Sequence, residues 1–183
     1  MKLYKLTNSN YQTRNNTQWG EGITHSVTVV PNPQLCSKDV LHAYTSINLA
    51  LLLNPSHAQL DPDTMCLFEV IGEVVVQDWG KVGCVTLTTI NRLQLPIWFT
   101  DVQCRIKVCA AFSKLCARAV ATESPTWESP TWEAANAAVA RATSWAAEAA
   151  SWAAAAAATK ANTERIDFVA LADQAVTEVL NEN

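Results

Sequence analysis

Glycine is scarce in this sequence, and residues 131–183 contain neither glycine nor proline. Only five glycines occur among the 183 residues. Because these two residue types disrupt helices most strongly, their absence predicts a C-terminal part that is helical. Alanine takes their place and fills 17 of the 28 positions in residues 134–161. Alanine is the best helix former, so this segment predicts a long helical arm.

A secretory signal, a transmembrane run and a Cys-x-x-Cys pair are also missing. Polar residues follow directly after residues 1–6, which differs from a signal peptide. The alanine segment comes closest to a membrane span, but Arg141, Glu148 and Lys160 interrupt or bound it. These absences predict a cytoplasmic protein without membrane contact, whose six cysteines are reduced.

Charge and histidine spacing exclude two further classes of function. The formal net charge is −4 and the basic residues are scattered along the sequence, so no nucleic-acid interface is expected. The three histidines, His25, His42 and His57, are too widely spaced for a zinc signature. The sequence therefore predicts neither a metal nor a cofactor.

The sequence divides into an α+β domain, residues 1–99, and a helical region, residues 100–183. In the first part, β-branched or alternating stretches predict a small, mainly antiparallel sheet. A short helix is expected from Ser46, a good N-cap, to about residue 53, where Asn54 and Pro55 end it. Gly72 predicts a bulge or bend within its strand. The expected strands cover residues 1–6, 23–30, 41–45, 65–77 and 83–90, with a loop at 7–17.

The second part is expected to contain an amphipathic helix from about residue 100 to 123, followed by the alanine-rich arm. Apolar residues recur there at steps of three or four from Val102 to Val120. The pentapeptide Ser-Pro-Thr-Trp-Glu then occurs twice, at 124–128 and 129–133, and either copy is suited to begin a helix. The arm is one long helix or two helices with a break at 159–163. A further apolar stripe spans residues 166–179.

Three tryptophans of the arm, Trp132, Trp145 and Trp152, are the predicted interface residues. Trp145 and Trp152 are seven residues apart, close to two helical turns, so they lie on one face of the helix. Flanking alanines would let another helix approach closely. The pattern is compatible with packing inside the chain, with a subunit or partner interface, or with ligand binding. We expect a homodimer or a complex with a host protein.

His42, Tyr44 and Glu69 form the candidate catalytic group. His42 and Tyr44 alternate on an expected strand and therefore face the same side. With a nearby carboxylate they could perform acid–base chemistry or bind a nucleotide. The alternative is that these polar groups stabilise the framework of the strand.

The first hundred residues contain several distinctive segments: 2–7, 19–25, 35–37, 41–45, 49–57, 68–74 and 83–90. Through them the chain resembles a domain family of bacteria, phages and prophages whose members often carry an alanine-rich tail. This resemblance implies a phage-associated or mobile-element-associated protein in a bacterial host. Tyr4, the segment His42-Ala43-Tyr44, and Glu69 or Glu73 are in turn similar to elements of ADP-ribosyltransferase-like small domains.

The expected function is therefore that of a phage-type accessory protein. It would act by protein–protein binding and inhibit a host defence or regulatory protein. The alternatives are an ADP-ribosyltransferase-like enzyme or nucleotide-binding protein, and a structural subunit of an oligomer.

Overall fold

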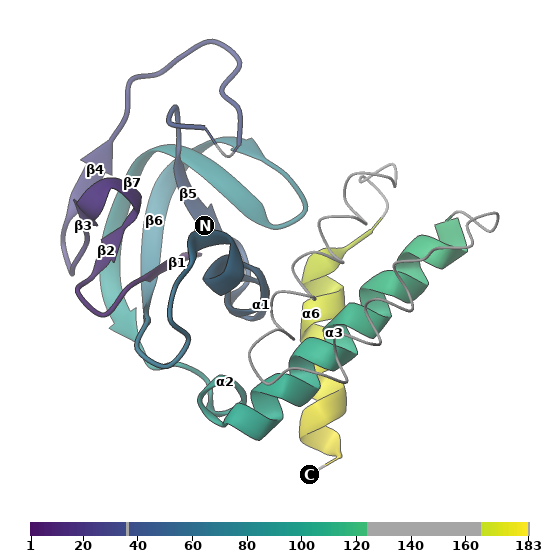
Figure 1. The fold of residues 1–183 in the computed structure, drawn as a ribbon. Coiled ribbons are helices and arrows are strands. Elements are labelled where there is room, and N and C mark those ends of the chain that lie inside the picture. The colour runs from purple at the N-terminus through teal and green to yellow at the C-terminus, as the bar shows by residue number, and fades with distance from the viewer. Residues whose placement is uncertain (36, 124–165, 183) are drawn as a thin grey trace. The chain divides into compact units, whose positions relative to one another are not determined.

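The computed structural model describes residues 1–35, 37–123 and 166–182 (Figure 1). The chain forms two compact units, Met1–Leu95 and Pro96–Asn183. The predicted boundary between residues 99 and 100 lies four residues beyond this division. Strands and helices are both present, which confirms the α+β class. The alanine-rich arm with Trp132, Trp145 and Trp152, the duplicated pentapeptide and the predicted break at 159–163 lie outside the described residues.

In the first unit, the structure describes short strands near the N-terminus, two long strands near its end and one helix between them. These elements are β1 (Leu3–Thr7), β2 (Gln12–Thr13), the 3-10 turn η1 (Arg14–Asn16), β3 (Thr17–Gln18), β4 (Thr24–Ser26), β5 (Leu41–Tyr44), α1 (Ile47–Ala58), β6 (Cys66–Gln77) and β7 (Lys81–Leu93).

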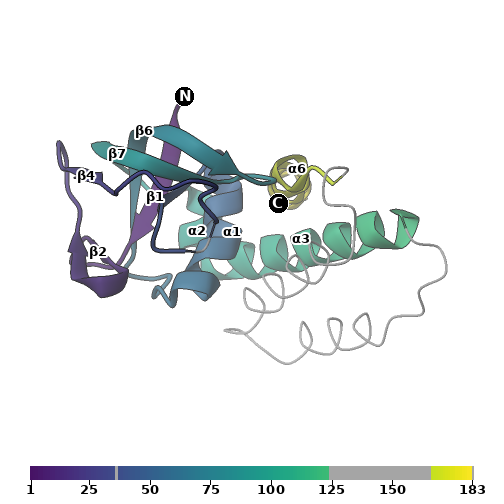
Figure 2. The ribbon, with the colours of Figure 1, turned by 90° about the horizontal axis from the view of Figure 1, so that it is seen from above.

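Four of these strands close into a ring. β1 pairs with β5 and β6, and β7 pairs with the same two strands, always in antiparallel orientation. β4 pairs with the same edge of β7 as β5 does, but further along β7. Figure 1 shows β6 and β7 as long curved strands, and Figure 2 shows the same unit from above. The predicted antiparallel sheet is thus confirmed, and closure pairs strands that would otherwise have open edges.

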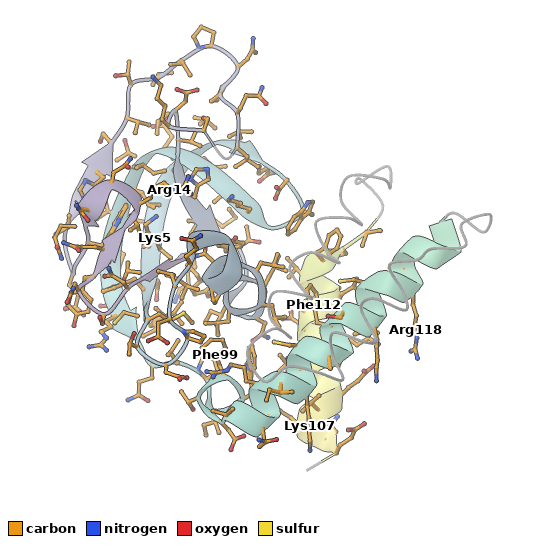
Figure 3. All side chains as sticks on the ribbon, viewed as in Figure 1. Lys5, Arg14, Phe99, Lys107, Phe112 and Arg118 are labelled. Atoms are coloured by element: carbon orange, nitrogen blue, oxygen red, sulfur yellow. The ribbon has the colours of Figure 1, made fainter. Side chains whose placement is uncertain are left out.

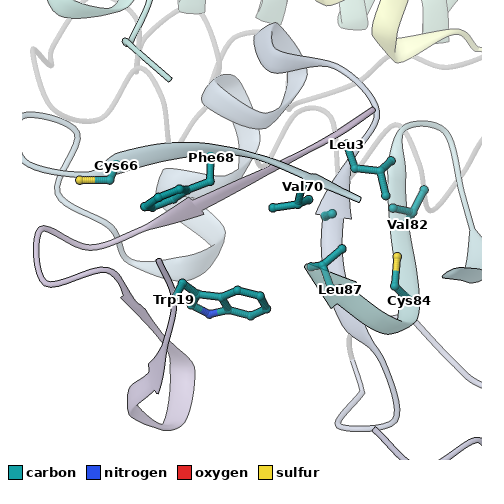
Figure 4. Close-up of a cluster of buried hydrophobic side chains, with 9 residues drawn as sticks. Leu3, Trp19, Cys66, Phe68, Val70, Val82, Cys84 and Leu87 are labelled. Atoms are coloured by element: carbon teal, nitrogen blue, oxygen red, sulfur yellow. The ribbon is translucent and has the colours of Figure 1, made fainter. Parts of the chain in front are cut away.

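The interior of the ring is a cluster of buried side chains (Figure 4). Trp19 and Phe68 are its largest members, and both are at most 2% exposed. Because side chains alternate along a strand, Lys5 shares the face of β1 that carries Leu3 of this cluster. The cluster consists of Leu3, Trp19, Ala43, Cys66, Phe68, Val70, Val82, Cys84 and Leu87.

Helix α1 begins as predicted but ends later. The Ser46 hydroxyl accepts from the backbone N–H of Leu49 at 3.3 Å, which is an N-cap. The helix continues through Pro55 to Ala58, so the predicted end at Asn54-Pro55 is wrong. Pro55 lacks an N–H, yet its carbonyl accepts from Leu60 at 2.9 Å. This hydrogen bond, together with Gln59 at a φ of 54°, ends the helix after Ala58.

Strand β6 contains register irregularities, as the predicted bulge or bend requires, but they do not lie at Gly72 itself. Gly72 pairs regularly with Leu87, and the register shifts lie at Glu69/Val70 and beyond Glu73. Glycine is needed there for another reason: a Cβ atom would lie 2.5 Å from the carbonyl oxygen of Thr86. The position therefore marks a close approach of two strands.

Two expected segments at the N-terminal end of the unit are corrected. The strand expected over residues 23–30 is only β4, because β5 occupies the neighbouring stretch of the same edge of β7. The segment 7–17, expected to be a loop, contains β2 and η1.

The second unit is helical in its described residues. It contains α2 (Ile97–Thr100), α3 (Val102–Glu123) and α6 (Phe168–Asn181). α3 packs against α6, and Figures 1 and 2 show these helices crossing rather than running in parallel. The predicted stripe of α6 is buried at Ala172, Val176 and Val179. Phe112 and Phe168 are fully buried in this unit, and Trp98 is 4% exposed.

Candidate functional site

A cleft of about 840 Å³ lies in the first unit. It is lined by side chains of β1, of the segment from β2 to Trp19, of β5 and of the C-terminal end of α1. Its lining residues are Lys5, Leu6, Asn8, Gln12, Thr13, Arg14, Asn15, Asn16, Thr17, Trp19, Val27, Ser37, Lys38, Val40, Leu41, His42, Tyr44, Asn54, Ala58, Gln59, Leu60 and Lys81. A volume of this order accommodates a small molecule.

The charged side chains of this cleft are all basic. Lys5, Arg14, Lys38 and Lys81 line it together with His42, and none of its lining residues is Asp or Glu. This concentration of positive charge contrasts with the net charge of −4 for the whole chain. Because an enclosed surface of one sign attracts ions of the other, the cleft is suited to an anion.

Lys5 is the most unusual of these basic residues. It is 8% exposed, its ammonium donates to the carbonyl oxygen of His42 at 2.8 Å, and it lies 4.2 Å from the centre of the Trp19 ring. β1 and β5 share a single paired position, Tyr4 with Tyr44, so the Lys5 side chain bridges the strands just beyond it. Both partners of the ammonium are neutral. Burial lowers the pKa of Lys5 to about 7.

Arg14 reaches the cleft from a turn made of two asparagines. Asn15 and Asn16 have φ angles of 63° and 55°, in the left-handed region that asparagine tolerates better than most residues. Upstream, the Asn8 carboxamide oxygen accepts from the backbone N–H groups of Asn10 and Gln12 at 3.0 and 2.8 Å. These contacts shape the segment that carries Arg14, which lines the cleft together with Lys5 (both are labelled in Figure 3).

Trp19 anchors the other end of this segment. Its indole N–H donates to the hydroxyl of Thr13 at 2.9 Å, and its ring lies edge-on to His25 with the ring centres 4.5 Å apart. The same ring belongs to the core and lines the cleft. The core thereby fixes one wall of the cleft.

The structure places two of the three predicted catalytic residues in the cleft. His42 and Tyr44 line it, whereas Glu69 is not among the lining residues and forms an ion pair with Lys2 at 3.2 Å. The strand registers set Tyr4 opposite Tyr44 on one side and opposite Glu69 on the other. Tyr44 and Glu69 are therefore two strands apart, roughly 10 Å between backbones.

The four basic residues of the cleft were not predicted as a group. They lie far apart in the sequence, and only the closing of the ring and the course of its loops bring them together. One signal was present in the segment Leu3-Tyr4-Lys5-Leu6-Thr7. Lys5 lies two residues after Leu3 and therefore on the same, buried face of the strand. A lysine at such a position is unusual, because burying an unpaired charge is unfavourable.

The cysteines of the described residues are free thiols. In α3, burial raises the pKa of both Cys109 and Cys116 to about 12, which keeps these thiols protonated and unreactive. Among the described residues, no three His, Cys, Asp or Glu side chains gather as a metal-binding group.

No helix within the described ranges is both long and apolar enough to cross a membrane. In comparisons with known proteins, no family model, no curated protein and no solved structure matches this chain. The two resemblances noted from the sequence therefore stay predictions.

Proposed function

We propose that this protein acts by binding, and that its first unit takes a small anionic molecule into the cleft. The observation that carries the proposal is the charge of the lining: four basic side chains and His42 without a carboxylate among the lining residues. Ionised partners make the stronger hydrogen bonds, and a partly enclosed site reduces their screening by salt. A phosphate-bearing molecule such as a nucleotide has the appropriate charge and size.

The proposal is tested by removing single charges from the cleft. ADP binding to the full chain is measured by isothermal titration calorimetry, with adenosine as the uncharged probe. We expect ADP to bind and adenosine to bind much more weakly. Arg14→Gln and Lys38→Gln should each weaken ADP binding by tenfold or more, since a hydrogen bond to a charged group is worth about 1.5–3 kcal/mol.

Lys114→Gln is the matched control, because Lys114 is an exposed residue of α3 and does not line the cleft. It should bind ADP as the parent does. Equal losses in all three variants, or equal binding of ADP and adenosine, would contradict a site in the cleft. NAD serves as a third probe, and its turnover would favour the ADP-ribosyltransferase-like alternative.

A second candidate function is binding of a protein partner, either a host protein in the manner of a phage accessory protein or a second copy of the chain. Ile71 and Val75 on the outer half of β6 are 48% and 38% exposed. Within the described part of the chain, β1 pairs with β6 only as far as Val70, so β7 is the one strand that pairs with this outer half. An exposed apolar strand with an open edge favours strand addition by a partner.

The expected homodimer is tested through the tryptophans of the arm. Light scattering of the parent chain should give a mass above that of a monomer. Trp145→Ala combined with Trp152→Ala should shift the population towards monomer, since large buried aromatic residues contribute most to such contacts. A parent that stays monomeric at high micromolar concentration would contradict the homodimer.

A further inference from the structure

The Lys5 ammonium is buried without a carboxylate beside it. The ammonium contacts the backbone carbonyl of His42 and the ring of Trp19, and neither group carries a negative charge. On the neighbouring strand β6, Glu69 forms its ion pair with Lys2 and not with Lys5. Buried charges are normally paired, because removing an ion from water is unfavourable unless a partner compensates.

The other groups that surround Lys5 do not supply this partner. From β7, Lys81 adds positive charge, and burial raises the pKa of the Cys84 thiol, which keeps it neutral near pH 7. On β6 the register partner of Lys5 is Phe68, and the neighbouring titratable group in the core is Cys66. β5 contributes His42. Among the other lining residues of the cleft, Arg14 and Lys38 are basic as well.

The protonation of Lys5 therefore depends on what the cleft contains. Burial is the main reason that its pKa is lowered from 10.5 to about 7, and the positive charge of Lys81 lowers it further. Near neutral pH the amine is thus charged only in part of the molecules. A negative charge nearby favours the ammonium form and would raise the pKa again.

We propose that the charged group of the bound anion contacts the Lys5 ammonium, and that the amine takes up a proton from solution as the anion binds. This inference rests on the proposed function and specifies how the same site is regulated. Binding then responds to pH: the affinity falls as the pH rises above neutrality, approaching tenfold per pH unit while the free amine is deprotonated.

The test measures proton uptake directly. ADP is titrated into the full chain at pH 8, where its phosphates are fully ionised, in two buffers that differ in their heat of protonation. The difference between the two measured heats gives the number of protons taken up. We expect close to one proton per ADP for the parent chain.

Two substitutions of Lys5 separate charge from protonation. Lys5→Arg keeps a side chain that is always charged, so it should bind ADP with almost no proton uptake and little dependence on pH between 7 and 9. Lys5→Met removes the charge, and it should lower the affinity at pH 7 by tenfold or more and abolish proton uptake. Circular dichroism checks that both variants are folded.

His42→Gln tests the other candidate proton acceptor, since histidine also changes charge near neutral pH. Uptake that survives in this variant supports Lys5 as the group that gains the proton. Uptake that disappears in His42→Gln, that persists in Lys5→Met, or that is absent from a parent that binds ADP would overturn the inference and leave the proposed function standing. A parent that binds no ADP at any pH would overturn the proposed function itself.

Discussion

Replacing Trp19 by alanine is expected to lower the free energy of unfolding by about 3–5 kcal/mol, the usual range for a large aromatic residue removed from a core. Trp19 is 2% exposed and packs within the interior cluster of the ring. The substitution also removes the donor to the Thr13 hydroxyl at 2.9 Å and the ring that faces the Lys5 ammonium. Both contacts connect the core to the wall of the cleft, so stability and anion binding should decline together.

The measurement is urea unfolding followed by circular dichroism, because the other six tryptophans obscure a fluorescence signal. Trp19→Phe should give an intermediate loss, since it retains most of the apolar contact and loses the indole donor. Val29→Ala is the control: Val29 is 72% exposed, and its truncation should change stability by less than about 0.5 kcal/mol. A loss below 1 kcal/mol for Trp19→Ala would show that the core inside the ring of strands is not organised around this side chain.

Raising the pH from 7 to 9 is expected to stabilise the fold by about 2 kcal/mol through Lys5 alone. The sign follows from proton binding. Burial lowers the pKa of Lys5 to about 7, whereas in the unfolded chain it is near 10.5. Between these values the unfolded chain binds more protons than the folded one, so unfolding becomes less favourable as the pH increases, by up to about 1.4 kcal/mol per unit.

Three buried thiols oppose this effect in the upper part of this pH range. Burial raises the pKa of Cys84, Cys109 and Cys116, which lowers stability as the pH rises above about 8, where unfolded thiols begin to lose their protons. Burial also raises the pKa of Asp78, which acts in the acid range. Unfolding experiments at half-unit steps from pH 6.5 to 8, where Lys5 accounts for about 1 kcal/mol between pH 7 and 8, should show the slope before the thiols contribute.

Lys5→Met should abolish this slope and be more stable than the parent at pH 7, since an apolar side chain replaces a buried, unpaired amine. Lys114→Gln is the control with an exposed lysine and should keep the slope. If the parent and Lys5→Met have the same pH dependence, Lys5 is not buried as described.

Local patterns in the sequence were sufficient for most helices and strands. The hydrophobic repeat of α6 and the alternation around β6 and β7 each arise within a single element, so they can be recognised without knowing its neighbours. Gly72 could be noticed in the same way, but its reason could not, because the atoms that exclude a Cβ there belong to the neighbouring strand. The predicted end of α1 was wrong because the missing N–H of Pro55 does not end the helix. The helix ends instead where the carbonyl of Pro55 accepts a hydrogen bond.

The sequence by itself determined an α+β protein with an antiparallel sheet followed by amphipathic helices, since periodicity and turn residues are local properties. It also singled out His42 and Tyr44, which share one face of a strand. Only the tertiary structure decided that β1, β5, β6 and β7 close into a ring and that the basic residues of the cleft meet. Those contacts join residues far apart in the chain, and their positions follow from strand pairing and loop paths that no local pattern contains.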